Sequence, residues 1–360
     1  MLKTKIHDHS IWKLQLEEVK KLAESIDYSI EEMVVQTKLH PNPTFILGSG
    51  KIEELKEKLI ELQADNVIFW NNLTSKQTLN LKQILSYEKE VNIKDRYDLT
   101  LEIFEKNATD NLSKMQIELA RTRKQLPLYK LEANVTYNKD KAGFRSGGEY
   151  AFHSKIKTYD KRIAGLNKEI AKFKENKMKN IENRKKRLNS RFICLTGYYN
   201  AGKTTLFNKL TGSEKLTSDK PFTTLSSKYS KSTRNHDLFF IDTIGFVLDL
   251  DPRLIKSFEL NLLDMQYADK LLYLIDATED KELIFNKAQY GLNLLNKLDI
   301  DIFSKIIIIF NKIEKLENSE EYIENLIEEF PAFFKKLPHL NVSGVNGQNI
   351  DLIVDLLINV

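Results

Sequence analysis

GYYNAGKT, at Gly197–Thr204, is the stretch that decides the fold of this 360-residue chain. It follows the apolar run Phe192–Leu195, which predicts a strand, and it leads into Thr205–Leu210, which predicts a helix. A strand, a GxxxxGK[ST] turn and a helix in this order are typical of a phosphate-binding loop, because successive backbone N–H groups converge there on a polyphosphate. The sequence therefore predicts a nucleoside-triphosphate site at this turn.

Each polar residue of the loop has an expected role. The Lys203 ammonium is expected to reach the β- and γ-phosphates, and the Thr204 hydroxyl to ligate Mg²⁺. The predicted nucleotide contacts within the loop are Gly197, Asn200, Ala201, Gly202, Lys203, Thr204 and Thr205.

Residues 191–360 alternate short apolar runs with helical stretches, which predicts a parallel sheet with helices on both faces. The expected strands are Phe192–Thr196, Asp237–Ile241, Leu271–Asp276, Ile306–Phe310 and Leu340–Ser343. The expected helices are Lys203–Leu210, Arg253–Tyr267, Glu282–Lys297, Glu320–Lys336 and Asn349–Ile358. The fold class is therefore α/β, with a carboxy-terminal P-loop domain at 191–360.

Residues 1–110 predict a second, smaller α/β domain. The expected helices are Leu14–Ala23, Ile52–Leu62 and Ser75–Leu85, with strands at Met33–Leu39 and Val67–Trp70. Phe45–Lys51 forms a glycine turn before a helix, and a helix cap is favoured there over a second phosphate site.

Residues 111–190 predict an antiparallel helical hairpin. Two apolar series keep a three-to-four spacing typical of a coiled coil, interrupted in the first series only by Thr122, and Pro127 is expected to kink or end the first helix. The glycine-containing stretch Lys139–Gly148 would join the helices. The two seams are Leu112, Met115, Leu119, Leu126, Tyr129 and Ala133, and Ile156, Tyr159, Ile163, Leu166, Ile170 and Phe173.

The net charge of +4 conceals a strong asymmetry. Lys155–Arg191 contains 14 basic and 4 acidic residues, a local charge of +10, so the remainder carries −6. This pattern favours a polyanionic partner for the segment; a solvated lysine face is the alternative. No apolar run approaches the ~20 residues of a membrane span, so we expect a cytoplasmic protein, taken as a monomer. Cys194 is expected to be a buried structural residue.

Further stretches favour a GTPase over a general ATPase. Asp242, Thr243, Ile244 and Gly245 follow a strand, so Asp242 is placed to hold Mg²⁺ and the Gly245 N–H to meet the γ-phosphate. Before them lie Phe222, Thr223 and Thr224, of which Thr224 is favoured as a further Mg²⁺ ligand. The expected catalytic group is thus Lys203, Thr224 and Gly245.

The stretch Asn311-Lys312-Ile313-Glu314 stands where a guanine-binding NKxD motif would follow its strand. An aspartate there accepts hydrogen bonds from guanine N1–H and the 2-amino group, which adenine does not offer. Glu314 is the same acceptor on a longer stem. Ser343 and Gly344 complete the predicted base site.

Phe246 follows Gly245, where many GTPases carry a glutamine that orients the attacking water. A phenylalanine has no group for this task. We therefore expect slow intrinsic hydrolysis that a partner stimulates.

Together these stretches resemble the HflX family of GTPases. The resemblance implies a translation-factor-class GTPase that binds GTP, GDP and Mg²⁺ and associates with the large ribosomal subunit. With that partner, the basic segment at 155–191 becomes a candidate contact to ribosomal RNA, with Arg184–Arg187 as the cluster to test. The departures from the family pattern include Glu314, which replaces an aspartate, Gly344, which stands where an alanine is usual, and Arg145–Glu149, which lacks a usual proline. Besides the loop, the matching residues are Thr224-Leu225, Asp242–Phe246, Ile46–Leu55, Asn71–Thr74, Gln77, Asn80, Asp95-Arg96, Ile103-Phe104 and Gln116–Ala120.

Two other functions fit parts of the pattern. Glu314 leaves open an ATP- or GTP-using enzyme that remodels RNA or ribosomes. Phe246 leaves open a non-catalytic RNA-binding module that nucleotide merely orders. Turnover of GTP and ATP, with and without ribosomal subunits, separates these three hypotheses.

Overall fold

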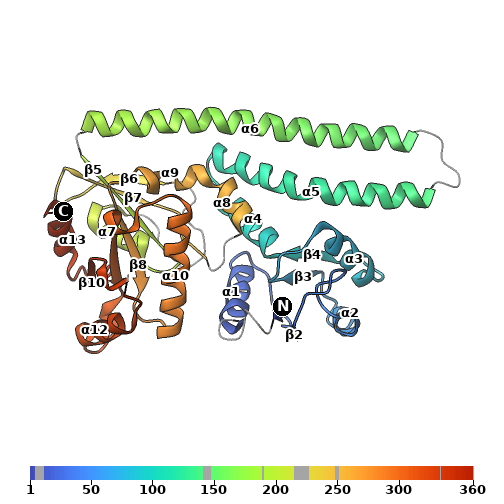
Figure 1. Cartoon of the computed structure of the whole chain (residues 1–360), viewed down its shortest axis with the longest axis horizontal. Helices are drawn as coiled ribbons and strands as arrows, with labels where there is room; N and C mark the ends of the chain where they lie inside the picture. The colour runs from blue at the N-terminus through green and yellow to red at the C-terminus, as the bar shows by residue number, and fades with distance from the viewer. Residues whose placement is uncertain are drawn as a thin grey trace. The chain divides into compact units, whose positions relative to one another are not determined.

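The computed structural model describes residues 1–4, 12–140, 147–188, 190–214, 227–247, 251–332 and 334–359 (Figure 1). The chain forms two compact units. The first unit contains residues 1–106 and 114–172, and the second contains residues 107–113 and 173–360. No helix in the described ranges combines the length and apolar character needed to cross a membrane.

The first unit begins with an α/β domain that has two pairs of parallel strands, β1 with β2 and β3 with β4. Its core gathers apolar residues from strands and helices, including Leu2, Ile52, Phe69 and Leu81. Thr74 and Gln77 form a capping box at the start of α3. The elements are β1 (Leu2–Thr4), α1 (Trp12–Glu24), β2 (Gln36–Lys38), α2 (Ser49–Glu61), β3 (Asn66–Phe69), α3 (Ser75–Leu85), β4 (Asn92–Asp95) and α4 (Arg96–Asn107).

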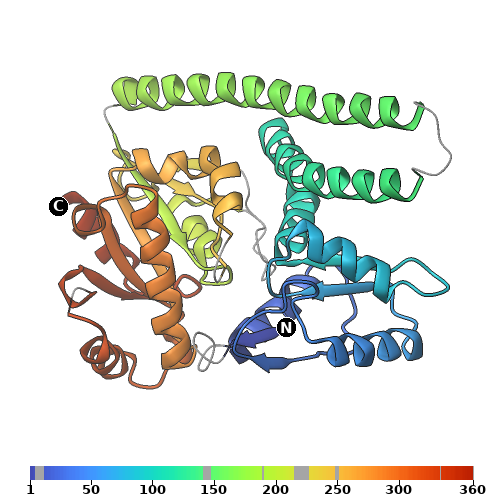
Figure 2. The same ribbon diagram turned by 45° about the vertical axis from the view of Figure 1, so that its right-hand side comes forward.

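Two long helices, α5 (Asn111–Asp140) and α6 (Gly147–Leu188), form the predicted hairpin. Their parts within the first unit lie side by side and run in opposite directions (Figures 1 and 2). The Tyr129 and Tyr159 ring centroids are 5.7 Å apart, and Arg123 donates to Asn167 at 2.9 Å. Helix α5 continues through Pro127 and does not end there. The connecting residues 141–146 lie outside the described ranges.

The second unit contains a six-stranded sheet in the order β10-β9-β8-β5-β7-β6. All neighbouring strands are parallel except β6, which is antiparallel to β7. The parallel arrangement brings the carboxyl ends of β5, β7, β8, β9 and β10 to one edge, where ligands bind in such folds. The strands are β5 (Arg191–Gly197), β6 (Lys228–Lys231), β7 (Leu238–Asp242), β8 (Lys270–Asp276), β9 (Ile306–Asn311) and β10 (His339–Val342).

Helices cover both faces of this sheet (Figure 2). Phe207 of α7 and Ile353 of α13 pack with Leu272 on one face. On the other face, the Tyr273 hydroxyl donates to Lys287 O of α10 at 3.0 Å. The helices are α7 (Lys203–Thr211), α8 (Pro252–Ser257), α9 (Glu259–Tyr267), α10 (Lys281–Lys297), α11 (Ile302–Lys305), α12 (Ser319–Glu329) and α13 (Ile350–Asn359), with 3-10 turns η1 (Ile313–Lys315) and η2 (Phe334–Lys336).

Three predicted elements differ from the structure. The single helix expected at 253–267 is divided at Phe258 into α8 and α9. The helix expected at 320–336 ends at Glu329, because Pro331 cannot continue it. Of the strand expected at 33–39, the structure has Gln36–Lys38, which pairs with Leu2–Thr4 of β1.

Candidate nucleotide site

The phosphate-binding loop connects the end of β5 to the start of α7. Gly202 precedes α7 with a φ of +90°, and a side chain there would collide with the Asn311 amide. Only glycine satisfies both the conformation and the close approach. Asn200 also has a positive φ, +59°. The turn therefore directs backbone N–H groups and the N-terminus of α7 toward an anion.

Lys203 is the first residue of α7 and is only 8% exposed. Its Nζ donates to Tyr198 O at 2.6 Å. The pKa of this ammonium is lowered to about 8, chiefly by burial; the Asp242 carboxylate opposes this shift, and the Lys287 ammonium adds to it. A polyphosphate would supply the negative charge that favours the protonated form.

The lowered pKa of Lys203 predicts a pH dependence of nucleotide binding. Above pH about 8 the nucleotide-free lysine is largely neutral, so it must take up a proton when a triphosphate binds. We expect the contribution of Lys203 to affinity to be constant below about pH 7 and to fall as the pH rises past about 8. Calorimetry at about pH 8.5 in buffers of different ionisation enthalpy measures this uptake. Binding without proton uptake there would contradict the assignment.

Thr204 and Asp242 come together at the carboxyl edge of the sheet. The Thr204 hydroxyl donates to Asp242 Oδ2 at 3.2 Å, and Asp242 is fully buried at the end of β7. A hydroxyl and a carboxylate are oxygen ligands of the kind that Mg²⁺ prefers, and both residues fit a metal at this edge. The third predicted ligand, Thr224, lies outside the described residues with Phe222 and Thr223.

The stretch after Asp242 turns most of its side chains inward. The Thr243 hydroxyl donates to Leu195 O at 2.7 Å, and Ile244 is buried. Any contact of these two residues with nucleotide would therefore come from their backbone. Gly245 lies beside the loop: a Cβ atom built on it would be 2.9 Å from Lys203 Nζ. Gly245 and Lys203, two members of the predicted catalytic group, are thus brought together.

Phe246 is directed into the core. Its N–H donates to Gly197 O at 3.0 Å, and its carbonyl accepts from Tyr199 N–H at 3.0 Å. Its ring packs edge-on against Tyr198, with centroids 6.3 Å apart, and lies 6.5 Å from the Tyr273 ring. The backbone of Phe246 therefore hydrogen-bonds to the phosphate-binding loop, while its side chain packs in the core and does not face the phosphate position.

Lys287 of α10 is a site residue that the sequence did not reveal. Its ammonium lies 5.6 Å from the Tyr198 ring centroid and 5.9 Å from that of Tyr199. It also forms an ion pair with Glu279. No motif marks it, because it lies far from the loop in sequence and reaches it only through the packing of α10 against β8.

Asn311 links the phosphate loop to the predicted base site. Its Nδ2 donates to Ala201 O at 2.8 Å, and its Oδ1 accepts from Gly344 N–H at 3.0 Å. Lys312 has a φ of +70° and pairs with Asp276 at 2.6 Å. The ends of β5, β9 and β10 are therefore held together by one buried amide.

Glu314 presents an acceptor without a donor. Its Oε2 is buried and makes no hydrogen bond in the described part of the chain. Such an atom is costly unless a ligand supplies a donor, and guanine offers N1–H and its 2-amino group. Ser343, which directly precedes Gly344, is fully buried, and its hydroxyl accepts a hydrogen bond from Asn346 N–H at 3.0 Å.

Polar groups of the glycine turn at Phe45–Lys51 bond to other residues of the first unit. Gly48 N–H donates to Gln36 Oε1 at 2.8 Å, and Lys51 pairs with Glu54 at 2.8 Å. Gly48 directly precedes α2, so the turn acts as the predicted helix cap.

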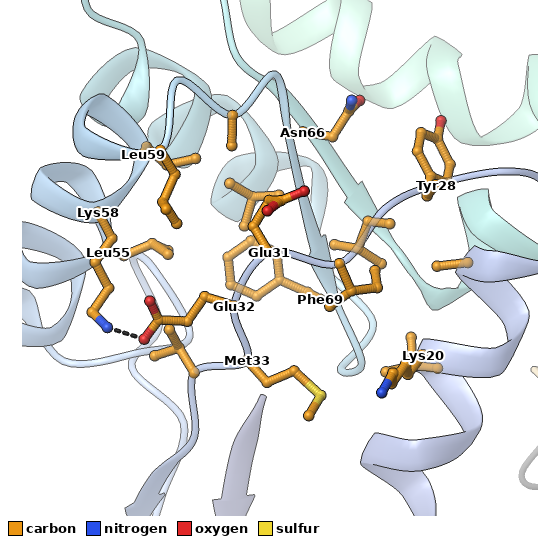
Figure 3. A pocket seen from close by; sticks show the side chains of 18 of the residues that line it. Lys20, Tyr28, Glu31, Glu32, Met33, Leu55, Lys58, Leu59, Asn66 and Phe69 are labelled. Atoms are coloured by element: carbon orange, nitrogen blue, oxygen red, sulfur yellow. Dashed lines mark hydrogen bonds and ion pairs between the residues drawn. The ribbon is translucent and has the colours of Figure 1, made fainter.

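A cavity of about 430 Å³ lies elsewhere in the first unit, between α1, α2, β3 and residues 27–34 (Figure 3). Its walls are largely apolar, with Phe69 and Leu59 pointing into it. Glu32 pairs with Lys58 at its edge, and Glu31 accepts from Ser29. None of the predicted nucleotide residues lines it.

Comparison with known proteins agrees with this geometry. Three family models match consecutive parts of the chain: "GTP-binding GTPase N-terminal" at 13–105, "GTP-binding GTPase Middle Region" at 107–185 and "50S ribosome-binding GTPase" at 192–312. GTPase HflX of Thermofilum pendens is 35% identical, with 87% of this chain and 73% of that one aligned. GTPase HflX of Saccharolobus solfataricus is 32% identical, with 94% of each chain aligned.

The chain belongs to the HflX family of GTPases. The crystal structure of an SsGBP and GDP complex is also similar, with a TM-score of 0.54 and 27% identity over 96% of this chain and 95% of that one. This family membership confirms the fold class and the resemblance inferred from sequence. The protein is thus a GTP-hydrolysing enzyme that binds guanine nucleotide.

Proposed function

We propose that this HflX-family protein is a Mg²⁺-dependent GTPase that associates with the large ribosomal subunit. The observation that carries the nucleotide part is Glu314 Oε2, a buried acceptor without a donor at the predicted base position. We assign nucleotide chemistry to residues 191–360. Ribosome contact is assigned to the domain at 1–110 and the hairpin at 111–190.

The proposed chemistry divides among a few residues. Lys203 neutralises charge that develops on the β- and γ-phosphates, and the Gly245 N–H contacts the γ-phosphate. Thr204, Asp242 and Thr224 would hold Mg²⁺, which neutralises the phosphate oxygens when it is bound. Loss of the γ-phosphate would release Thr224 and Gly245 and thereby change the domain arrangement.

Intrinsic GTP hydrolysis should be slow, because Phe246 offers no group that orients the attacking water. Since this side chain is buried, replacing it with glutamine should not make hydrolysis faster. The side chain at this position points toward Tyr198 and Tyr273, so Phe246→Gln is expected to leave the single-turnover rate within about twofold of the parent. The variant should also melt at a lower temperature, because an amide replaces a buried ring. Phe303→Gln is the matched control, since Phe303 is 61% exposed. A tenfold faster intrinsic rate would contradict this account.

The large ribosomal subunit is proposed as partner on two grounds. The model that matches residues 192–312 describes 50S ribosome-binding GTPases, and the segment 155–191 carries a charge of +10. A monomer acting in the cytoplasm fits this proposal. Co-sedimentation with large subunits tests it: the protein should pellet with them in the presence of a non-hydrolysable GTP analogue and much less with GDP. If the protein did not pellet with large subunits in the presence of either nucleotide, the proposal would be contradicted.

A further inference from the structure

Several basic side chains of α6 are engaged within the protein. Lys155 lies 4.5 Å from the Tyr129 ring centroid, and Arg162 pairs with Glu118. Two members of the 184–187 cluster are also engaged: Arg184 stacks 4.3 Å from the Tyr229 ring centroid, and Lys185 pairs with Asp269 at 2.7 Å. Two of the four side chains of this cluster therefore already have partners within the protein.

Four other lysines of α6 are exposed: Lys157, Lys161, Lys168 and Lys172. None has an ion-pair partner among the described residues. With about 100° per residue, their side chains fall within an arc of about 60° along one face of the helix. The apolar seam, with Leu166 fully buried at its centre, lies on the opposite face.

The residues that border this arc are small and uncharged. Ala164 and Ala171 lie just beyond one edge of it and Gly165 just beyond the other, whereas Asp160 and Glu169 project farther to its two sides. No atom lies within 4 Å of a Cβ atom built on Gly165, so packing in the described structure does not require glycine there. Glycine weakens a helix interior relative to alanine. The close approach of a partner would explain the missing side chain.

We propose that Lys157, Lys161, Lys168 and Lys172, with Gly165 between them, form a docking surface for the sugar–phosphate backbone of double-helical RNA. The residues form two pairs, each spaced by about 6 Å, with the pairs about 16 Å apart along a rigid helix. The helix holds the two lysine pairs at a constant spacing, and the small residues beside them let the RNA backbone approach closely. We call these four residues the lysine stripe.

The composition of the arc favours a duplex over a single strand. Single-stranded RNA is commonly held by aromatic side chains that stack on its bases. In α6, Phe152 and Tyr159 pack against Tyr129 in the hairpin. Phe173 is 42% exposed, but it lies about 100° around the helix from Lys172, on the side of the apolar seam. Double-helical RNA is recognised mainly through shape and backbone contacts, which lysines can supply without reading sequence.

The proposal rests on the proposed ribosome association and is tested by replacing all four stripe lysines with glutamine. Binding to a 16-base-pair RNA duplex and to large subunits is measured across a salt series. We expect affinity for both to fall about tenfold or more at low salt, with the log–log salt slope less steep by about three. The matched control replaces four exposed G-domain lysines, Lys256, Lys297, Lys335 and Lys336, and should change affinity by less than about twofold.

Gly165→Leu tests the close approach without changing charge. It should retain or raise helicity and melting temperature, yet weaken both binding reactions several-fold. Unchanged slopes in the stripe variant, while the parent binds subunits, would overturn the stripe and leave the proposed function standing. Loss of subunit binding with unchanged duplex binding would instead indicate an acidic protein surface and also overturn the proposal. Failure of the parent to bind subunits would refute the proposed function itself.

Discussion

Replacing Lys203 with methionine is expected to weaken triphosphate binding by at least about a hundredfold, because several charge-assisted hydrogen bonds to the phosphates are lost together. Methionine fills a similar volume, so the buried site should keep its shape. Fluorescent GTP-analogue binding measures the loss. Lys209→Met is the matched control: Lys209 is an exposed lysine of the same helix, and its replacement should leave affinity unchanged.

The same variant should make the nucleotide-free protein more stable. The Lys203 pKa is about 8 in the folded protein and 10.5 when unperturbed, so the unfolded chain binds this proton more tightly. Stability of the parent should therefore rise as the pH increases from about 8 toward 10.5, and Lys203→Met should remove most of this dependence. At neutral pH, Lys203→Met should raise the free energy of unfolding of the nucleotide-free protein by at most about 3 kcal/mol. A variant that binds GTP as tightly as the parent would show that the loop is not the site.

Glu314→Ala is expected to cost about 1–3 kcal/mol of guanine-nucleotide binding, since a buried charged acceptor is lost. Adenine nucleotides should bind the variant as they bind the parent. Glu314→Asp should sharpen the preference for guanine, because the shorter acceptor matches the NKxD geometry. Affinities for GDP and ADP, measured on all three proteins, test this ordering.

Glu317→Ala provides the control for this series. Glu317 is exposed, lies three residues further along the same segment and carries the same charge. Its replacement should leave both affinities unchanged. Equal binding of GDP and ADP by the parent would count against a guanine site and would favour an ATP-using remodelling enzyme.

Much of the second unit was predictable because its determinants are local. Strand β9 consists almost entirely of apolar residues, and the GxxxxGK[ST] turn places α7 at the end of β5. Strand β6 was missed because Lys228–Lys231 is short and polar, as edge strands often are. Composition alone would continue α12 past Glu329, but Pro331 prevents this. Pro127, by contrast, lies inside α5 and does not end it.

The candidate site was predictable only where motifs mark it. Asn311 could be placed after its strand, but its two hydrogen bonds to Ala201 and Gly344 depend on how three strand ends meet. The contact of Lys287 with the Tyr198 and Tyr199 rings arises from helix packing, which no local pattern records. Sequence alone also could not show which basic residues of α6 pair or stack with other described parts of the chain.

Multiple-turnover hydrolysis of GTP and ATP by the full chain, with and without large ribosomal subunits, tests the central claim most directly. The account predicts slow GTP turnover by the protein alone, a clear acceleration by large subunits and much weaker ATP turnover in both conditions. ATP hydrolysis that matches GTP hydrolysis, or GTP hydrolysis that large subunits leave unchanged, would contradict it.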